Sequence, residues 1–278
     1  MSSEHGRLFA ALAIAGTTLL LPRAAQAYHT PSQRVTDDTA DTLEQGGLRL
    51  GLFKVEYTLL KDFTVGTYPL PWFLRVANLH MKWRYWAGEQ LSLSARLGYS
   101  GFNTAHLERI DEQKTTAFVA VIPFDVAATY RFDPTFSLSL DLIWTSVYVK
   151  GTLDQDAFDG TFQGGTTNLQ SLFTLEARLG KVTSLLMQPR FLSYQLANYQ
   201  GDVVLHPDEF TTIEVHGAQQ SDALDFRGAW SLTLSALFSW ERFNLRLGVG
   251  YGNYNVPGIN FMLPERTLFP DLDFYWVF

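Results

Sequence analysis

Apolar and polar residues alternate one by one in the segment DLDFYWVF, residues 271–278 of the chain. Because successive side chains of a β-strand point to opposite faces, four apolar side chains share one face and two carboxylates share the other. The apolar face consists of Leu272, Phe274, Trp276 and Phe278, and the polar face of Asp271 and Asp273. Such a strand suits a lipid bilayer on one side and a polar lumen on the other, since water would leave these aromatic rings exposed. An edge strand of a soluble β-sandwich is the alternative.

The same alternation recurs in segments of roughly ten residues that are separated by turns, which is the signature of transmembrane β-barrels. One segment covers residues 118–132, another covers 230–240, and a third covers 245–251. We therefore predict an all-β fold, a transmembrane up-and-down antiparallel β-barrel. Twelve strands are expected, the first of them a weakly patterned strand around Val35–Leu43, and ten strands are the alternative.

The segment 271–278 resembles the closing strand of Gram-negative outer-membrane β-barrels, which carries an aromatic residue read by the assembly machinery. This resemblance implies that Leu272, Phe274, Trp276 and Phe278 form an assembly signal. It also implies outer-membrane lipid, lipopolysaccharide and the barrel-assembly machinery as partners. The stretches TLEQGGLRLG (42–51), VEY (55–57) and VANLHMK (76–82) are similar to a group of uncharacterised barrels of roughly twelve strands, for which no activity is implied.

The beginning of the chain has the pattern of a secretory signal peptide, with an apolar run over residues 8–21 and a small-x-small site at Ala25–Ala27. We expect three parts: a signal peptide (1–27), an acidic N-terminal segment (28–46) and the barrel (47–278). The chain has no cysteine, which excludes disulfides, lipoprotein anchoring and thiolate metal sites.

Short and long connections alternate along the predicted barrel. Turns such as 61–62, 133–135 and 241–244 are short, whereas long loops are expected at 102–116, 151–166, 197–225 and 255–266. In outer-membrane barrels the short turns face the periplasm. We therefore expect an outer-membrane location with both the N- and C-termini in the periplasm.

Charged residues occur opposite the apolar faces of the predicted strands. A charge facing lipid at the bilayer midplane would cost about 2–4 kcal/mol for Arg or Lys, so these side chains are expected to point into the lumen. They are His80, Lys82, Arg84, Arg96, Asp125, Arg131, Asp141, Glu176, Arg178, Arg190 and Arg246, with Lys54, Glu56, Asp271 and Asp273 as further members. A network of ion pairs filling the lumen is one interpretation, and a basic element selective for anions is the other.

Other motifs carry weaker chemical signals. His206 and Asp208 lie two residues apart, where a carboxylate could orient an imidazole, but such pairs are common in polar loops. The stretch Asp154–Gly160 resembles a calcium loop with its third aspartate one place too late. We expect no catalytic residues, no metal and no cofactor. The formal charge of −7 argues against nucleic acid as a partner.

Three functions fit these patterns. A narrow, porin-like outer-membrane channel for small solutes is the leading hypothesis. The alternative is a non-conducting outer-membrane subunit of a larger envelope complex for secretion, surface assembly or motility, which would bind periplasmic or outer-membrane partner proteins. An outer-membrane enzyme, a hydrolase, is the minor alternative.

Overall fold

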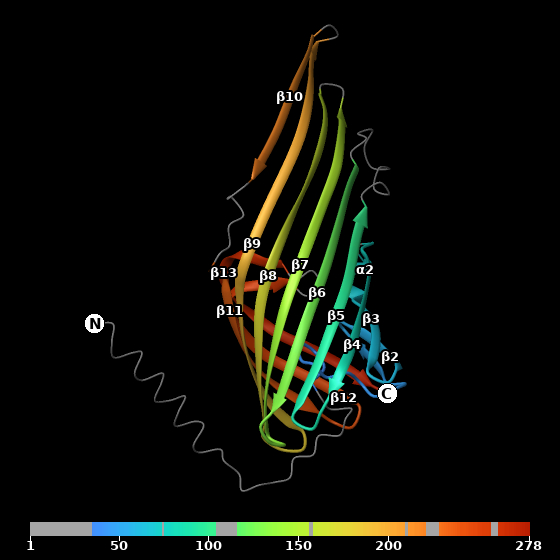
Figure 1. Ribbon diagram of the computed structural model, residues 1–278, viewed down its shortest axis with the longest axis vertical. Coiled ribbons are helices and arrows are strands. Elements are labelled where there is room, and N and C mark those ends of the chain that lie inside the picture. Colours follow the sequence, from blue (N-terminus) through green and yellow to red (C-terminus); the bar gives the residue numbers. More distant parts are fainter. Residues whose placement is uncertain are drawn as a thin grey trace, which may run out of the picture.

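The computed structural model describes residues 35–73, 75–103, 116–155, 158–208, 211–220, 228–256 and 261–278. The described chain is almost entirely β-sheet (Figure 1). Its strands are β1 (Leu48–Gly51), β2 (Val55–Leu60), β3 (Phe63–Thr67), β4 (Ala77–Ala87), β5 (Leu91–Asn103), β6 (Thr116–Arg131), β7 (Phe136–Gln155), β8 (Phe158–Arg178), β9 (Thr183–Asp208), β10 (Thr211–Gln220), β11 (Trp230–Ser239), β12 (Phe243–Val256) and β13 (Phe261–Val277). A short helix, α2 (Pro69–Phe73), connects β3 to β4.

These strands form a closed antiparallel barrel. Strand β13 pairs with both β12 and β1, and β9 pairs with both β8 and β11, so the sheet has no open edge in the ring. Strand β10 pairs with the far part of β9 and stands outside the ring, which leaves twelve strands in it. The predicted twelve-stranded barrel is confirmed.

The expected position of the first strand is wrong. Residues 35–43 form turns and irregular backbone instead of a strand, and β1 begins at Leu48. The weak pattern in Val35–Leu43 does not lead to pairing because this segment lies inside the barrel, where its polar groups bind lumen side chains. The twelfth strand comes instead from the short pair β1 and β2.

The alternation places apolar side chains outside and polar ones inside. On β4, Leu79 and Trp83 are more than half exposed, whereas His80 and Lys82 are buried. Aromatic rings contact one another near the short turns, for example Phe243 with Trp276 at 5.0 Å. None of the helices among the described residues has the length and apolar character needed to span a membrane.

The barrel wall has very uneven height. Strands β1, β2 and β3 have 4, 6 and 5 residues, and we call them the low wall. Strands β7, β8 and β9 have 20, 21 and 26 residues, and we call them the tall wall. A transmembrane strand needs about 9–11 residues. The tall wall therefore extends well past one end of the barrel (Figure 1).

Two of the expected loops are largely strand. The segment 151–166 continues β7 and β8, which pair as far as Gln155 and Phe158, and the segment 197–208 continues β9. We call the end of the barrel with the short connections, such as Lys61–Asp62, the turn end, and the opposite end the loop end.

Candidate functional site

The lumen is crossed near the turn end by the segment Val35–Leu43, which we call the plug. One end of the plug packs through Val35 against Leu186 and Leu237, and the other end packs through Leu43 against Tyr275 and Val277. Within the part of the chain that the structure describes, no barrel strand forms backbone strand pairing with the plug. The plug is therefore held by side chains rather than by sheet hydrogen bonds.

Lys82 of β4 is the central anchor of the plug. Its ammonium donates hydrogen bonds to the backbone carbonyls of Thr36, Thr39 and Asp41, at 2.8, 2.7 and 2.7 Å. Three acceptors match the three donors of a lysine ammonium. Because Lys82 is buried, breaking these bonds would leave a buried charge without hydrogen-bond partners, which is costly.

A second anchor is the carboxylate of Asp41. It accepts hydrogen bonds from the guanidinium groups of Arg131 and Arg84. Arg84 also pairs with Asp62 in the turn between β2 and β3. The backbone N–H of Ala40 donates to the Thr129 hydroxyl at 2.8 Å. These contacts tie the plug to β4 and β6.

The plug residue Asp37 lies between two cations, Arg49 on β1 and Lys54 in the connection from β1 to β2. Arg49 Nη1 lies 2.7 Å from Asp37 Oδ2, and Lys54 Nζ lies 3.0 Å from Asp37 Oδ1. Burial raises the pKa of the Asp37 carboxyl, but Arg49 and Lys54 outweigh burial and hold this pKa well below its usual range. Asp37 therefore stays ionised and bound to both cations at neutral pH.

Arg49 also joins the plug to the closing seam of the barrel. Its Nη2 lies 2.8 Å from Asp273 Oδ2 on β13, and its guanidinium lies 3.8 Å from the centre of the Tyr275 ring. Glu56 of β2 completes this group, with Lys54 at 2.8 Å. The buried Arg49 on β1 thus contacts residues of β13, β2 and the plug.

His80 faces the same cluster. Its Nε2 lies 3.2 Å from Glu56 Oε1, and the ring lies 4.9 Å from the centre of the Tyr68 ring. The residue opposite on β3 is Gly66, where an added Cβ would lie 2.6 Å from His80 Nε2. The absence of a side chain at Gly66 therefore makes room for the imidazole.

The structure pairs most of the other predicted lumen charges. Arg96 lies 2.6 Å from Asp125 and 3.6 Å from Asp141, on the next two strands. Arg178 lies 3.0 Å from Glu176 on its own strand, and Arg246 lies 3.1 Å from Asp271 on β13. Arg190 differs, because its Nη1 donates to the Gln170 side-chain oxygen at 2.9 Å.

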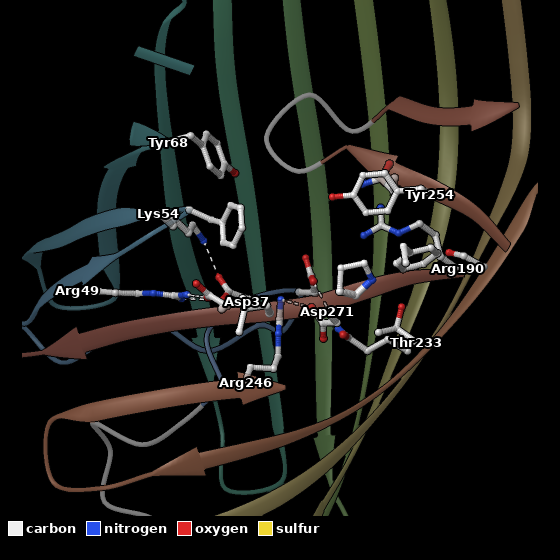
Figure 2. A pocket seen from close by; sticks show the side chains of 18 of the residues that line it. Asp37, Arg49, Lys54, Tyr68, Arg190, Thr233, Arg246, Tyr254 and Asp271 are labelled. Carbon is white, nitrogen blue, oxygen red and sulfur yellow. Dashed lines mark hydrogen bonds and ion pairs between the residues drawn. The ribbon is translucent and has the colours of Figure 1, made fainter. Parts of the chain in front are cut away.

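A cavity of about 360 Å³ lies on the loop-end side of the plug. Figure 2 shows Lys54 and Tyr68 on one side of it, Arg190 and Tyr254 on the other, and Asp37 of the plug between them. Nine of its nineteen lining residues are charged: Asp37, Asp38, Arg49, Lys54, Arg96, Arg190, Arg246, Asp271 and Asp273. The lining therefore carries charges of both signs.

Sequence reasoning missed Arg49 and the plug aspartates as lumen residues. Arg49 lies between Leu48 and Leu50, so the alternation rule could have placed it inward. Asp37, Asp38 and Asp41 had no such signal, because the plug is not a strand. Their position in the lumen follows from tertiary contacts with β1, β4 and β6.

The side chains of the weaker candidate motifs lie outside the part that the structure describes. This holds for His206 and Asp208 and for most of the stretch Asp154–Gly160. Among the described residues, no group of three His, Cys, Asp or Glu side chains could hold a metal ion. The signal peptide expected at residues 1–27 also lies outside the described residues.

The predicted assembly residues lie on β13 beside the seam. Leu272, Trp276 and Phe278 are exposed on the outer face and Phe274 is half-buried. The backbone of Phe278 exchanges two hydrogen bonds with Leu48, at 2.9 and 3.0 Å, and so helps to join β13 to β1. Their role as an assembly signal stays a prediction.

No protein-family model and no curated protein matches the sequence. Three of the solved structures that match the chain have TM-scores below 0.5. A TodX deletion mutant, a monoaromatic hydrocarbon channel, has a TM-score of 0.47 and 10% identity over 85% of this chain and 67% of its own. The monoaromatic hydrocarbon channel CymD has a TM-score of 0.36 and 10% identity, and the match covers 85% of this chain and 89% of CymD. The translocator domain of the autotransporter NalP from Neisseria meningitidis has a TM-score of 0.37 and 8% identity, and the match covers 83% of each chain.

The chain spans about two thirds of the length of TodX from P. putida, at 66%. These similarities concern architecture alone. The barrel architecture that the resemblance implied is shown by the closed ring of twelve strands itself.

Proposed function

We propose that the protein is an outer-membrane channel for small polar solutes whose narrow lumen is closed by the plug. The turn end faces the periplasm in this arrangement, and the cavity opens toward the loop end. The proposal is based on how the barrier between the cavity and the turn end is held. This barrier is the Val35–Leu43 segment. It is held by side-chain contacts, and it pairs with none of the described strands.

A barrier of this kind can move while the barrel stays closed. The ladders between neighbouring strands do not involve the plug, so its displacement breaks ion pairs, side-chain hydrogen bonds and the apolar contacts of Val35 and Leu43, but no strand pairing. The lumen exposed by this movement is lined by fixed charges, and a twelve-stranded barrel leaves little free cross-section. Polar solutes of small size are therefore the substrate class that fits.

Conductance of the purified protein in planar bilayers tests the proposal. The plug is altered in two ways: Lys82→Met removes the three hydrogen bonds to plug carbonyls, and a Gly-Ser sequence of equal length replaces Val35–Leu43. We expect little current through the wild-type protein and larger, more frequent openings in both variants. Arg178→Gln is the matched control, since Arg178 pairs with Glu176 and does not contact the described plug residues. A Gly-Ser variant that folds as a barrel and carries no current would refute the channel.

A second function is favoured by the tall wall. Strand β9 has 26 residues and β10 adds a further pairing beyond the ring, which is more sheet than membrane crossing requires. A projecting sheet of this kind suits a non-conducting subunit that binds other envelope proteins. Its test is affinity purification of the tagged full chain from native membranes, with a variant shortened at β9 and β10 as the control. Recovery of the same partners with both proteins would exclude this surface.

A further inference from the structure

Arg190 differs from every other cation that lines the cavity. Arg49, Lys54, Arg96 and Arg246 each lie within 3.1 Å of a carboxylate. Among the described residues, Arg190 forms no ion pair, and it donates a hydrogen bond to the neutral side chain of Gln170. A guanidinium has five N–H donors in a planar fork. Donors of Arg190 are therefore available to a ligand in the cavity.

Asp38 is the matching carboxylate on the plug. It lines the same cavity, forms no ion pair among the described residues, and receives one long hydrogen bond from Gln188 at 3.5 Å. Its φ of 56° is in the left-handed region, which aspartate tolerates in tight turns. Asp38 and Arg190 thus both line the cavity without forming an ion pair with each other.

The space between Arg190 and Asp38 suits a molecule that carries both charges. The cavity lining contains five cations and four carboxylates, so a solute with a single charge meets repulsion as well as attraction. Four aromatic residues, Phe53, Tyr68, Tyr254 and Phe269, also line the cavity. Its volume of about 360 Å³ is in the range of small-molecule sites.

We propose that this cavity binds a small zwitterion of the amino-acid type, with its carboxylate on Arg190 and its ammonium group on Asp38. The proposal rests on the proposed function and gives it a substrate class. Arginine binds carboxylates through two parallel N–H···O bonds, which fixes the orientation of the ligand. The aromatic residues provide apolar surface for the solute side chain. Because Asp38 belongs to the plug, the site is shared between the barrel wall and the movable segment.

Calorimetric titration of the purified full chain with three probes tests the site. Phenylalanine carries both charges, phenylpropionate carries the carboxylate only, and phenethylamine carries the ammonium only. We expect phenylalanine to bind most tightly to the wild-type protein. Arg190→Gln should weaken phenylalanine about 10- to 100-fold, the loss typical of a hydrogen-bonded charge. Asp38→Asn should weaken phenylalanine and phenethylamine and leave phenylpropionate binding equal or tighter.

Arg266→Gln is the matched control, because Arg266 is exposed, lies over the Trp230 ring and does not line the cavity. Heat-dependent gel migration shows that each variant is still a folded barrel. Equal binding of the three probes, no binding of any, or phenylalanine affinity unchanged by Arg190→Gln would overturn the zwitterion site. If plug variants conduct and no probe binds, the channel stands and this site fails; if probes bind and no variant conducts, the site stands and the channel fails.

Discussion

The low wall and the tall wall are built from the same alternating pattern but are stabilised in different ways. The tall wall forms long ladders, with twenty paired positions between β7 and β8. The seam between β1 and β13 has three paired positions, at Arg49, Leu50 and Gly51. Around this seam, buried charges replace backbone pairing: Arg49, Lys54, Glu56 and Asp273 are all at most 4% exposed.

This difference shows where the barrel is vulnerable. Backbone ladders are sequence-tolerant, since each position contributes one modest hydrogen bond. A buried ion-pair cluster is different, because removing one member leaves its partners buried without compensation. The low wall therefore depends on few side chains, and the plug shares two of them, Arg49 and Lys54.

The largest effect is expected for Arg49→Gln. The glutamine cannot neutralise Asp273, which loses its ion pair while buried, and Asp37 keeps only Lys54 as a cationic partner. Breaking a buried ion pair typically costs about 3–5 kcal/mol. Urea unfolding of the refolded protein, followed by tryptophan fluorescence, should show this decrease in the free energy of unfolding. Arg178→Gln on the taller β8 is the control and should cost clearly less, since Glu176 keeps the hydrogen bonds donated by the Ser137 and Ser184 hydroxyls; equal losses would show that the two walls do not differ.

A smaller loss is expected for Gly66→Ala on β3. The added methyl group would lie 2.5 Å from the Val55 carbonyl oxygen and 2.6 Å from His80 Nε2, so the backbone or the imidazole must shift. Overpacking of this kind typically costs about 1–3 kcal/mol. The double variant Gly66→Ala with His80→Ala separates the causes. If His80 is the obstacle, the second substitution recovers part of the loss, whereas no recovery assigns it to the Val55 backbone.

Removal of Phe278 should have a moderate effect at the same seam. It deletes the two backbone hydrogen bonds with Leu48, each worth about 0.5–1.5 kcal/mol net. We expect a smaller fraction of heat-resistant, fast-migrating barrel in membranes and unfolded chain in the periplasm. Phe278→Ala keeps the backbone bonds and removes the aromatic ring. A defect in this variant as large as in the deletion would assign the effect to the ring, as an assembly signal requires.

The closed barrel was predictable from sequence because period-two alternation is clear in segments such as 118–132 and 230–240. The inward position of Lys82 and Arg84 follows from that rule, but their partners do not. Lys82 binds plug carbonyls, and Arg84 binds Asp62 and Asp41. Partners such as these depend on where an irregular segment lies in three dimensions, which local periodicity does not encode. The heights of the walls were also missed, since the Gly- and Asp-rich stretch 151–166 has loop composition and yet pairs as strand.

The smallest effect is expected where the most residues are removed. Replacing residues 153–160 by Asn-Gly connects Thr152 to its partner Thr161 through a two-residue turn. The register of the remaining β7–β8 pairs is unchanged. The removed tip lies beyond the length that a bilayer requires, because β7 has 20 residues and about 9–11 suffice. The free energy of unfolding should therefore change by less than about 0.5 kcal/mol, the range of surface substitutions. Urea unfolding measures it beside Arg49→Gln. A loss comparable to that of the single arginine would mean that the tall wall contributes to the stability of the ring and does not merely project from it.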